Sequence, residues 1–308
     1  PDQMGLARAA ILLAGGQVVA IPTETVYGLA GDAQNGEAVA RIYQAKGRPS
    51  FNPLIVHVPD LDRARTIADL TPEAETLAAA FWPGALTLVL PLRADAGIAS
   101  LVTAGLSTIA IRVPAHPVAQ ALLRLTGPLA APSANASGRI SPTSADHVLD
   151  PDGGLDRRIA AVLDAGPCPV GVESTIIGWP HGRATLLRPG GIPAEAIAAT
   201  LGHPLADHQA DPAAPNAPGQ LTSHYAPQAA LRLNAATAAP GETHITFGTP
   251  GPFTLSETGD LAQAAARLFD TLRRADREGR PIAVAPIPDH GLGVAINDRL
   301  RRAAAPRG

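Results

Sequence analysis

Two spacings of apolar residues alternate along residues 1–200. Short apolar runs of strand length are separated by segments in which apolar residues return every three or four positions, as in a helix with one buried face. This alternation predicts an α/β layer fold. Thr71 followed by Pro72 supplies an N-cap and first-turn pair for one of the helices. The predicted strands are 18–22, 54–58, 86–91, 108–114, 160–166 and 174–178, and the predicted helices are 36–45, 72–81 and 116–125.

The pattern changes between residues 203 and 228, a stretch rich in Pro, Ala, Asp and Asn with no periodic apolar positions. Such a stretch predicts a linker. Beyond it, strand-like runs at 229–233, 243–247 and 281–287 accompany helical spacing at 260–275 and 293–304. We therefore expect three parts: an α/β domain over 1–202, the linker over 203–228, and a smaller α/β domain over 229–308.

Composition narrows the classes of protein to which the chain can belong. Hydrophobic residues form 46% of the 308 positions and aromatic residues only 3%, so a sizeable core would be mostly aliphatic. A net charge of −3 argues against a module that binds nucleic acid by electrostatics alone. The single Cys168 excludes a disulfide framework or a cysteine-rich zinc site. Without a signal-peptide pattern or an apolar stretch of about 18 residues, we expect a cytoplasmic protein with no membrane partner.

Lysine is nearly absent. Of the 24 basic residues, 23 are arginine, and Lys46 is the single exception. Arginine is a planar fork and lysine a compact charge on a flexible stem, so a site that needs the ammonium would keep its lysine under this bias. The alternative is that Lys46 has been retained by chance. The bias makes Lys46 a candidate catalytic residue.

The first polar cluster lies in IPTETVYGLAGDA (21–33), where a predicted buried strand runs into a turn with Thr23, Glu24 and Thr25. Proteins of the α/β class place ligands at the ends of buried strands. The alternative is a hydroxyl-rich turn that satisfies its own backbone groups. The pattern alone does not decide between the two.

The second cluster lies in KGRPSFNPLIVHV (46–58), where Lys46 and Arg48 are two positions apart in a loop interrupted by Gly and Pro. Two cations on one loop suit a polyphosphate, and Asn52 adds an amide to the same loop. His57 follows within the predicted strand. A lone histidine in such a strand is more often a hydrogen-bonded core residue than a functional group.

Three further segments carry polar groups beside predicted strands. In APSANASG (131–138), Ser133 and Asn135 stand among small residues, where hydroxyls and closely approaching backbone can hold phosphate or ribose oxygens. A plain polar loop is the alternative there. In GVESTIIG (171–178), Ser174 enters a strand, and in LLRPGGI (186–192), Arg188 precedes a Pro-Gly-Gly turn.

The chain has neither a P-loop nor a G-x-G-x-x-G after its first predicted strand, so a nucleotide site would need another design. The segments above, taken in order, resemble the YrdC-type catalytic domain of threonylcarbamoyl-AMP synthases over about residues 5–200. HYAP (224–227) and GLGVAINDRLRRAA (291–304) resemble the linker and C-terminal domain of the long, two-domain form. The resemblance implies a twisted mixed-sheet catalytic domain of the YrdC-like type and a smaller Rossmann-like α/β C-terminal domain.

The resemblance also implies an activity. The family carboxylates the amine of L-threonine with bicarbonate, transfers AMP from ATP onto the new carboxylate and releases pyrophosphate. A downstream tRNA threonylcarbamoyl-transfer complex then modifies the adenosine next to the anticodon, so tRNA is an indirect partner. Mg²⁺ is expected to arrive with ATP and to be held by the nucleotide, and no metal site is predicted in the protein itself.

The resemblance further implies a role for individual residues. Arg112 suits an α-carboxylate because a guanidinium can hold it with two bonds, and Lys46 and Arg48 are the expected catalytic pair. From its own residues, 203–228 is expected to be a lid over the reactive anhydride, because it ends in His224 and Tyr225, which can donate hydrogen bonds or stack on a base. The alternative is that it only tethers the C-terminal domain. The residues implied for threonine are Thr25, His57, Arg112, the backbone at Ala131, and Ser174. Those implied for ATP or the reactive carboxylate are Lys46, Arg48, Asn52, Thr108, Ser133, Asn135, Ser141, Arg188, His224 and Tyr225.

Two other functions compete with this one. Hydrogenase maturation proteins share the domain and form a carbamoyl adenylate, but they carry cysteine-rich zinc segments that a chain with one cysteine lacks. A non-catalytic RNA-binding module is the second alternative, and the net charge and the threonine-type residues argue against it. One departure from the family lies at 220–223 (QLTS), where basic residues often stand, and it weakens any closure of the linker by charge.

Overall fold

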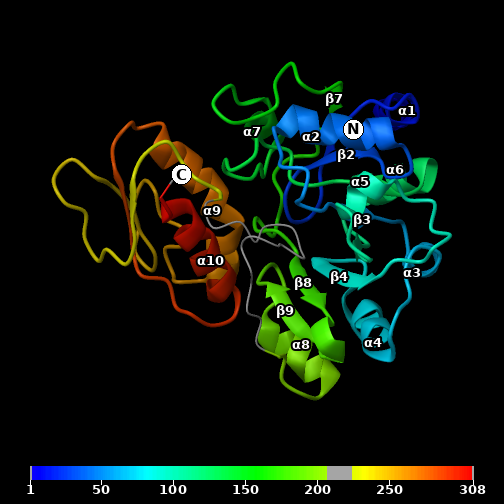
Figure 1. Ribbon diagram of the computed structural model, residues 1–308. Coiled ribbons are helices and arrows are strands. Elements are labelled where there is room, and N and C mark those ends of the chain that lie inside the picture. Colours follow the sequence, from blue (N-terminus) through cyan, green and yellow to red (C-terminus); the bar gives the residue numbers. More distant parts are fainter. Residues whose placement is uncertain (1, 207–223, 307–308) are drawn as a thin grey trace.

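Two sheets of different size organise the computed structural model, which describes residues 2–206 and 224–306 (Figure 1). Within those residues, the larger sheet has nine strands in the order β7-β1-β2-β6-β3-β5-β4-β8-β9, and the smaller has three in the order β10-β12-β11. The larger sheet is mixed: β3 pairs with β5 in parallel, whereas β3 with β6 and β4 with β5 are antiparallel. The smaller sheet is parallel throughout. The expected mixed-sheet fold with a small Rossmann-like partner is confirmed.

Each sheet is accompanied by its own set of helices. The strands of the larger sheet are β1 (Val19–Ile21), β2 (Gly28–Asp32), β3 (Ile55–His57), β4 (Leu86–Pro91), β5 (Thr108–Arg112), β6 (Leu129–Ala130), β7 (Ala161–Val162), β8 (Thr175–Gly178) and β9 (Thr185–Arg188). The helices around it are α1 (Gln3–Ala14), α2 (Gly36–Lys46), α3 (Leu61–Arg65), α4 (Pro72–Phe81), α5 (Ser100–Thr103), α6 (Pro117–Thr126), α7 (Ala145–Leu149) and α8 (Ala194–Leu201), with a short 3₁₀ turn η1 (Pro180–Gly182). The smaller sheet comprises β10 (Leu231–Arg232), β11 (Thr243–Ile245) and β12 (Ile282–Val284), with helices α9 (Leu261–Asp276) and α10 (Leu292–Ala304).

Each strand and helix predicted from the apolar pattern has a counterpart here, including the cap of α4, where Thr71 accepts from the N–H of Ala74. The predicted elements did not include α1, β2, β9 or α8, among others. A Cβ at Gly28 would meet the Cβ of Ala131 at 3.2 Å, and a Cβ at Gly31 would meet the Cδ1 of Ile42 at 3.1 Å. Glycine therefore lets neighbouring elements approach β2 closely.

The ends of α2 explain the placement of the two candidate catalytic cations. Asn35 caps the start of the helix by accepting from the N–H groups of Glu37 and Ala38. At the other end Gly47 takes a left-handed conformation with φ 59°. Lys46 is thus the last helical residue, and Arg48 begins the loop after a sharp change of direction.

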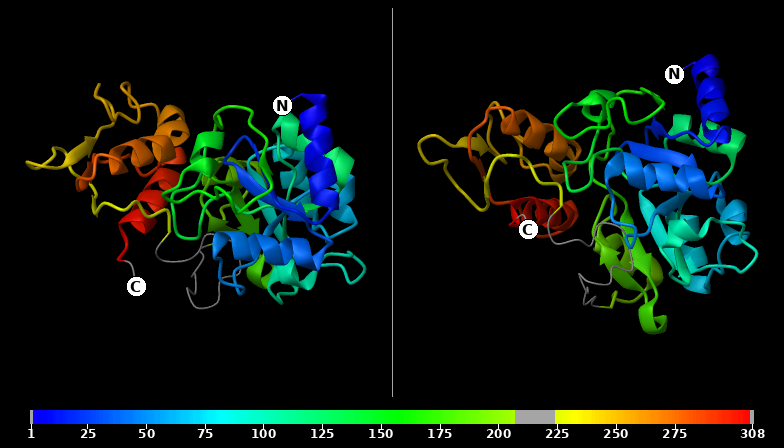
Figure 2. Two further views of the ribbon diagram at one scale, coloured as in Figure 1. Left: turned by 90° about the horizontal axis from the view of Figure 1, so that it is seen from above. Right: turned by 45° about the horizontal axis from the view of Figure 1, so that its top comes forward.

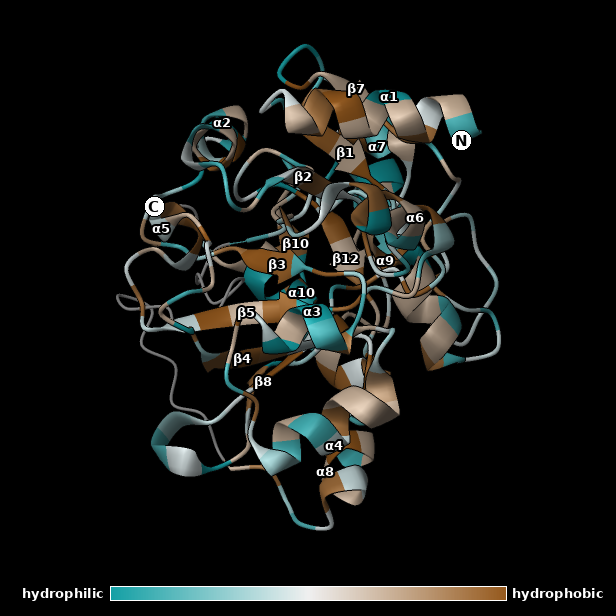
Figure 3. Ribbon diagram, turned by 90° about the vertical axis from the view of Figure 1, so that its right-hand side faces the viewer, coloured by the Kyte–Doolittle hydropathy of each residue, from teal (hydrophilic) through white to brown (hydrophobic). Residues whose placement is uncertain are grey.

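The core of the larger part is aliphatic, as its composition predicted. Strands β3, β4 and β5 are almost wholly buried, and Figure 3 shows them largely in the hydrophobic colours. Cys168 is buried too, and burial raises the pKa of its thiol to about 12, which suits a structural role. No helix in the described residues is long and apolar enough to cross a membrane.

The two sheets are joined by a shared apolar cluster. Val26, Ile140 and Val172 of the larger part lie in the same buried cluster as the inner faces of α9 and α10. Figure 2 shows these two helices on the side of the smaller part that faces the larger one. A Cβ at Gly171 would lie 2.4 Å from the carbonyl oxygen of Ala265, so α9 packs directly on that backbone. Of the predicted linker and lid over 203–228, residues 207–223, which include the QLTS departure, lie outside the described residues, so the predicted domain boundaries stay predictions.

Candidate active site

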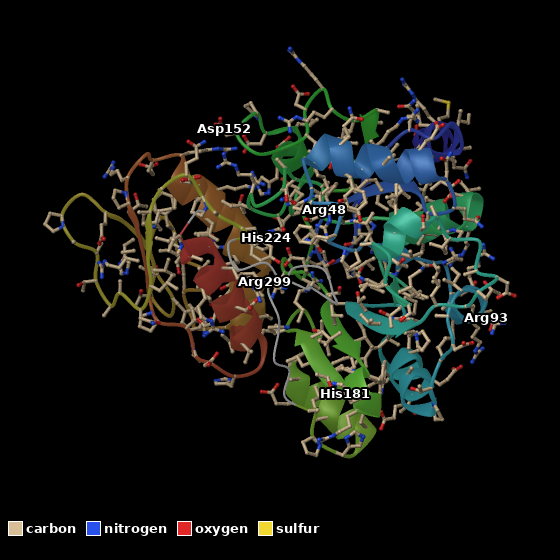
Figure 4. All side chains as sticks on the ribbon, in the orientation of Figure 1. Arg48, Arg93, Asp152, His181, His224 and Arg299 are labelled. Atoms are coloured by element: carbon tan, nitrogen blue, oxygen red, sulfur yellow. The ribbon has the colours of Figure 1, made fainter. Side chains whose placement is uncertain are left out.

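A pocket of about 560 Å³ lies over one face of the larger sheet. Ile55 and His57 both line it, because side chains two positions apart on a strand share a face. Figure 4 shows Arg48 and His224 near the junction of the two parts of the chain, where this pocket lies. Ten of the predicted ligand residues line it: Thr25, Arg48, His57, Arg112, Ala131, Ser133, Ser174, Arg188, His224 and Tyr225.

Lys46 stands behind the lining and supports it. Its side chain is buried, and Nζ donates to the carbonyl oxygens of Ser133 and Asn135, both at 2.5 Å. Burial, and then the charge of Arg48, lowers the pKa of Lys46 well below its usual value. The lysine therefore fixes the loop that carries Ser133 and brings a positive charge to its back.

Arg48 lies beside it and lines the pocket directly. Its Nε donates to the carbonyl oxygen of Asn52 at 3.1 Å and its Nη2 to that of Pro53 at 2.8 Å. Burial lowers the pKa of Arg48 to about 10, which leaves it cationic at neutral pH. Because these acceptors are neutral, its charge remains available to an anion.

Arg112 makes more hydrogen bonds within the protein than its predicted role as a threonine ligand requires. Its Nη2 donates to Glu24 at 2.6 Å, its Nη1 to Thr25 Oγ1 at 2.8 Å, and its Nε to a backbone carbonyl. A guanidinium has five N–H groups, so donors remain for a ligand carboxylate only alongside Glu24. The two-bond grip on threonine stays a prediction. Glu24, which we had not placed among the site residues, orients Arg112.

The turn before β2 combines both interpretations of its polar residues. The hydroxyl of Thr23 donates to the carbonyl of Val26 and accepts from the backbone N–H of Thr25, so Thr23 satisfies its own turn. Thr25 Oγ1 instead accepts from Arg112 and lines the pocket. Thr23 therefore satisfies its own turn although it also lines the pocket, and the ligand role of Thr25 stays a prediction.

Several of the predicted ligand residues have buried polar atoms without a hydrogen-bond partner. Among the described residues, seven buried side-chain nitrogen or oxygen atoms lack a hydrogen-bond partner. Four belong to predicted ligand residues: Asn52 Oδ1, His57 Nδ1, Asn135 Oδ1 and His224 Nδ1. A buried polar group without a partner costs free energy, so such atoms are typical of sites that await a ligand or water.

The two histidines are neutral. Burial, and then the charge of Arg112, lowers the pKa of His57 to about 3. Burial likewise lowers the pKa of His224 to about 3. At pH 7 each imidazole can therefore accept or donate a hydrogen bond without adding charge. For His57, the unpartnered Nδ1 and its place in the pocket lining favour a ligand contact over a satisfied core residue.

Ser174 and Arg188 form one wall of the pocket. Arg188 Nη2 donates to the carbonyl oxygen of Ser174 at 2.9 Å and to its Oγ at 3.2 Å. The same Oγ lies 2.7 Å from the hydroxyl of Thr87, which fixes its rotamer. Burial lowers the pKa of Arg188 to about 10, so it remains cationic at neutral pH. The wall thus offers a positioned hydroxyl and a second guanidinium.

Ser141 reaches the site through a carboxylate that we had not included. Its Oγ donates to Glu173 Oε1 at 2.5 Å, and Glu173 itself lines the pocket. Glu173 immediately precedes Ser174 in the GVESTI segment, which was the available sequence signal. Its second oxygen, Oε2, accepts from Arg299 at 2.9 Å, a residue from α10 near the other end of the chain.

Thr108 is set apart from the predicted ligand residues that line the pocket. It begins β5, whereas Arg112 ends it, and both side chains share one face because they are four positions apart. Thr108 is half-buried and does not line the pocket. Its contact with ATP stays a prediction.

Comparison with known proteins gives consistent matches over both parts. The family profile of Sua5, YciO and YrdC proteins, described as "Telomere recombination", matches residues 11–190. The profile described as "Threonylcarbamoyl-AMP synthase, C-terminal domain" matches residues 192–305.

Individual relatives extend over nearly the whole chain. A threonylcarbamoyl-AMP synthase of Bacillus subtilis is 42% identical over 98% of this chain and 93% of its own length. One from Pyrococcus abyssi is 41% identical over 95% and 92%. The crystal structure of P. abyssi Sua5 complexed with L-threonine superposes with a TM-score of 0.87 at 36% identity, over 98% of this chain and 95% of that one. The chain therefore belongs to the Sua5/YciO/YrdC family, in the form that carries the threonylcarbamoyl-AMP synthase C-terminal domain.

Proposed function

We propose that this chain is an L-threonylcarbamoyladenylate synthase, a nucleotidyltransferase that makes L-threonylcarbamoyl-AMP from L-threonine, bicarbonate and ATP. Relatives that match over more than nine-tenths of the chain carry the name threonylcarbamoyl-AMP synthase. The single structural observation that supports the proposal most is the convergence on one pocket of Arg48 and Arg188 with the unpartnered ring atoms of His57 and His224.

The arrangement suits attack at the α-phosphorus of ATP. The threonine nitrogen forms a bond to the carbon of bicarbonate with loss of water. An oxygen of the resulting carbamate then bonds to the α-phosphorus as the bond to pyrophosphate breaks. Such a transfer needs positioned positive charge more than covalent help. Arg48 and Arg188 line the pocket as cations, so both can act on phosphate oxygens, and Lys46 supports the Ser133 loop from behind the lining.

Threonine would occupy the side of the pocket formed by Thr25, His57 and Ser174. These groups offer hydroxyl and imidazole partners, and Arg112 stands next to them. The nucleotide would occupy the side with Arg48, Ser133 and Arg188. This division places the amino group of threonine and the triphosphate of ATP in one pocket. Such proximity is what the reaction requires.

Mg²⁺ fits this site as a companion of ATP. No cluster of three or more His, Cys, Asp or Glu side chains suited to a metal occurs in the part of the chain that the structure describes. The oxygen donors offered by predicted ligand residues are the unpartnered Oδ1 atoms of Asn52 and Asn135. When bound to the phosphates, Mg²⁺ would neutralise charge on the leaving pyrophosphate. The protein residues then have only to hold the triphosphate in place.

Substitution of His57 by alanine should weaken threonine binding selectively. The imidazole lies on the proposed threonine side, and its Nδ1 has no partner among the described residues. We expect the KM for threonine to rise by about tenfold or more, the value of one lost hydrogen bond to a buried polar partner, with a smaller change in the KM for ATP. Initial rates of pyrophosphate release at varied threonine and ATP give both constants. A change confined to the ATP constant would refute the assignment.

His224 and Tyr225 should contribute to synthesis together. Both line the pocket, and their rings make an edge contact with centroids 4.3 Å apart. Alanine at both positions removes a base-stacking or hydrogen-bonding wall, so we expect at least about tenfold slower synthesis or faster loss of the adenylate. The circular dichroism spectrum and melting temperature control for folding, because Tyr225 is also a core residue. Wild-type synthesis and product retention in the double variant would contradict this role.

The product implies a consumer. A mixed carboxylic-phosphoric anhydride hydrolyses readily, so a transfer complex that passes the threonylcarbamoyl group to tRNA would have to act soon after release. We propose that tRNA meets this chain only through that complex, and that the reaction takes place in the cytoplasm. The net charge of −3 favours this indirect role over direct tRNA binding.

Pyrophosphate release tests the proposal against the RNA-binding alternative. Purified protein with ATP and Mg²⁺ should release pyrophosphate only when threonine and bicarbonate are both present. A gel shift with tRNA, at low and at moderate salt, should give weak binding that salt abolishes. Tight, salt-resistant tRNA binding without threonine-dependent pyrophosphate release would favour the RNA-binding module.

A further inference from the structure

A buried threonine that lies outside the pocket lining makes a hydrogen bond to Ser174. Thr87 lies in β4, and this strand pairs in parallel with β8, which begins directly after Ser174 (Figure 1). Thr87 is 0% exposed, and its Oγ1 lies 2.7 Å from the Oγ of Ser174. Ser174 lines the pocket and Thr87 does not. The hydroxyl of Thr87 can therefore act on a ligand only through Ser174.

The direction of this hydrogen bond follows from the number of protons available. Each hydroxyl has one proton to donate and two lone pairs that can accept. Within the part of the chain that the structure describes, Ser174 Oγ is the single hydrogen-bond partner of Thr87 Oγ1. If Ser174 were the donor, the proton of Thr87 would be buried without an acceptor, which costs free energy. Thr87 is therefore the donor and Ser174 the acceptor.

The remaining bonds of Ser174 leave its own proton for the pocket. Its Oγ also accepts from Arg188 Nη2 at 3.2 Å, so both of its lone pairs are occupied. Apart from Thr87, the described residues offer no acceptor for the Ser174 proton. Because Ser174 lines the pocket, its hydroxyl can donate to a ligand there but has no lone pair left to accept from one.

The backbone of Ser174 is held in place as well. Its carbonyl oxygen accepts from Nε of Arg188 at 3.2 Å and from Nη2 at 2.9 Å. A Cβ at Gly190 would lie 2.4 Å from the carbonyl carbon of Ser174, so the turn after β9 packs directly against this backbone. The freedom that remains is in the Ser174 side chain, and its bonds to Thr87 and Arg188 fix that rotamer.

We infer that Thr87 is a positioning residue for threonine, because it holds the Ser174 hydroxyl as a hydrogen-bond donor toward an oxygen of the bound amino acid. This inference rests on the proposed function, in which Ser174 lies on the threonine side of the pocket. It assigns a direction to the Ser174 bond and a role to a residue behind the lining. The α-ammonium group has no lone pair, so the oxygen that faces Ser174 belongs to the hydroxyl or the carboxylate of threonine.

The test is a double-mutant cycle in the full chain, with L-threonine binding measured by titration calorimetry. Thr87→Val keeps the shape of the side chain and removes its hydroxyl, so threonine should bind about fivefold or more weaker, within the usual coupling between contacting groups. Ser174→Ala should weaken threonine binding by about tenfold or more. In the Ser174→Ala background, Thr87→Val should change the affinity by less than about twofold, because the group through which Thr87 acts is gone.

Two further variants separate positioning from a general loss of stability. Thr87→Ser keeps the hydroxyl and loses a methyl group, so we expect a lower melting temperature but a threonine affinity within about twofold of the wild type. Thr185→Val is the matched control. Thr185 is 2% exposed and does not line the pocket, and its Oγ1 donates to the carbonyl oxygen of Arg183 at 2.8 Å. This control should bind threonine as the wild type does.

Three results would overturn the inference: wild-type threonine affinity in Thr87→Val, an equal loss in Thr185→Val, or an additive loss in the double variant. If Thr87→Val does not fold, Thr87→Ala, which also lacks the hydroxyl, is compared with Thr87→Ser, and equal threonine affinities in these two variants would overturn it as well. All of these results leave the proposed function standing. A wild-type protein that binds no threonine and releases no pyrophosphate would instead refute the proposed function, and the inference with it.

Discussion

Replacing Lys46 by arginine should reduce synthesis of threonylcarbamoyl-AMP nearly as severely as replacing it by alanine. The Nζ atom lies 2.5 Å from each of two backbone carbonyl oxygens, and the residue is only 3% exposed. A planar guanidinium has a different shape and cannot take the place of the ammonium without displacing the Ser133–Asn135 loop. Loss of one positioned electrostatic contact typically costs about 10²–10³ in rate, and we expect both variants in that range.

The measurement is kcat for pyrophosphate release in the two variants, with melting temperatures to show that each is folded. Arg8→Lys, a conservative exchange on the exposed side of α1, is a control for basic-residue exchange in general and should leave the rate unchanged. Normal activity in Lys46→Arg would remove the argument drawn from the single lysine.

Valine should be a far poorer substrate than threonine, and serine should lie between them. The proposed threonine side presents the hydroxyls of Thr25 and Ser174 and the unpartnered Nδ1 of His57. Valine has the shape of threonine without its hydroxyl, so it would leave such a buried group unpaired. Sites of this kind reject the analogue by about 10⁴-fold, whereas serine keeps the hydroxyl and loses only the contacts of a methyl group.

Competing rates with threonine, serine and valine, each expressed as kcat/KM, give this discrimination directly. The expected order is threonine, then serine, then valine. If valine came within about tenfold of threonine, no protein group would be hydrogen-bonding the substrate hydroxyl, and the assignment of Thr25, His57 and Ser174 would have to be abandoned.

Sequence patterns predicted most of the elements because buried strands and one-sided helices leave a periodic trace. Among the elements that the pattern missed, β2 consists largely of glycine and other small residues, which pack closely against α2 and the 131–133 segment but carry no periodic signal. Short helices such as α3 and α7 depend on single capping residues, Asp60 and Ser144, and on tertiary contacts. Such elements have too few residues for a period to appear.

The site was predictable only in part, for a similar reason. Polar groups beside strand ends pointed to Arg48, Ser174 and Arg188, and the family resemblance added others, His57 among them. The carboxylates that orient the arginines were missed, because Glu24 and Arg112 are 88 positions apart and Glu173 and Arg299 are 126 apart. Pairing at such separations is set by the folded topology and leaves no local pattern in the sequence.

Formation of the adenylate itself tests the central claim most directly. Purified protein is incubated with ATP, Mg²⁺, L-threonine and ¹³C-labelled bicarbonate, and the products are resolved by mass spectrometry. We predict L-threonylcarbamoyl-AMP that carries the label in its carbamoyl carbon, together with an equal amount of pyrophosphate, and neither product when threonine or bicarbonate is omitted. Pyrophosphate release that does not depend on threonine, or an adenylate without the labelled carbon, would contradict the account.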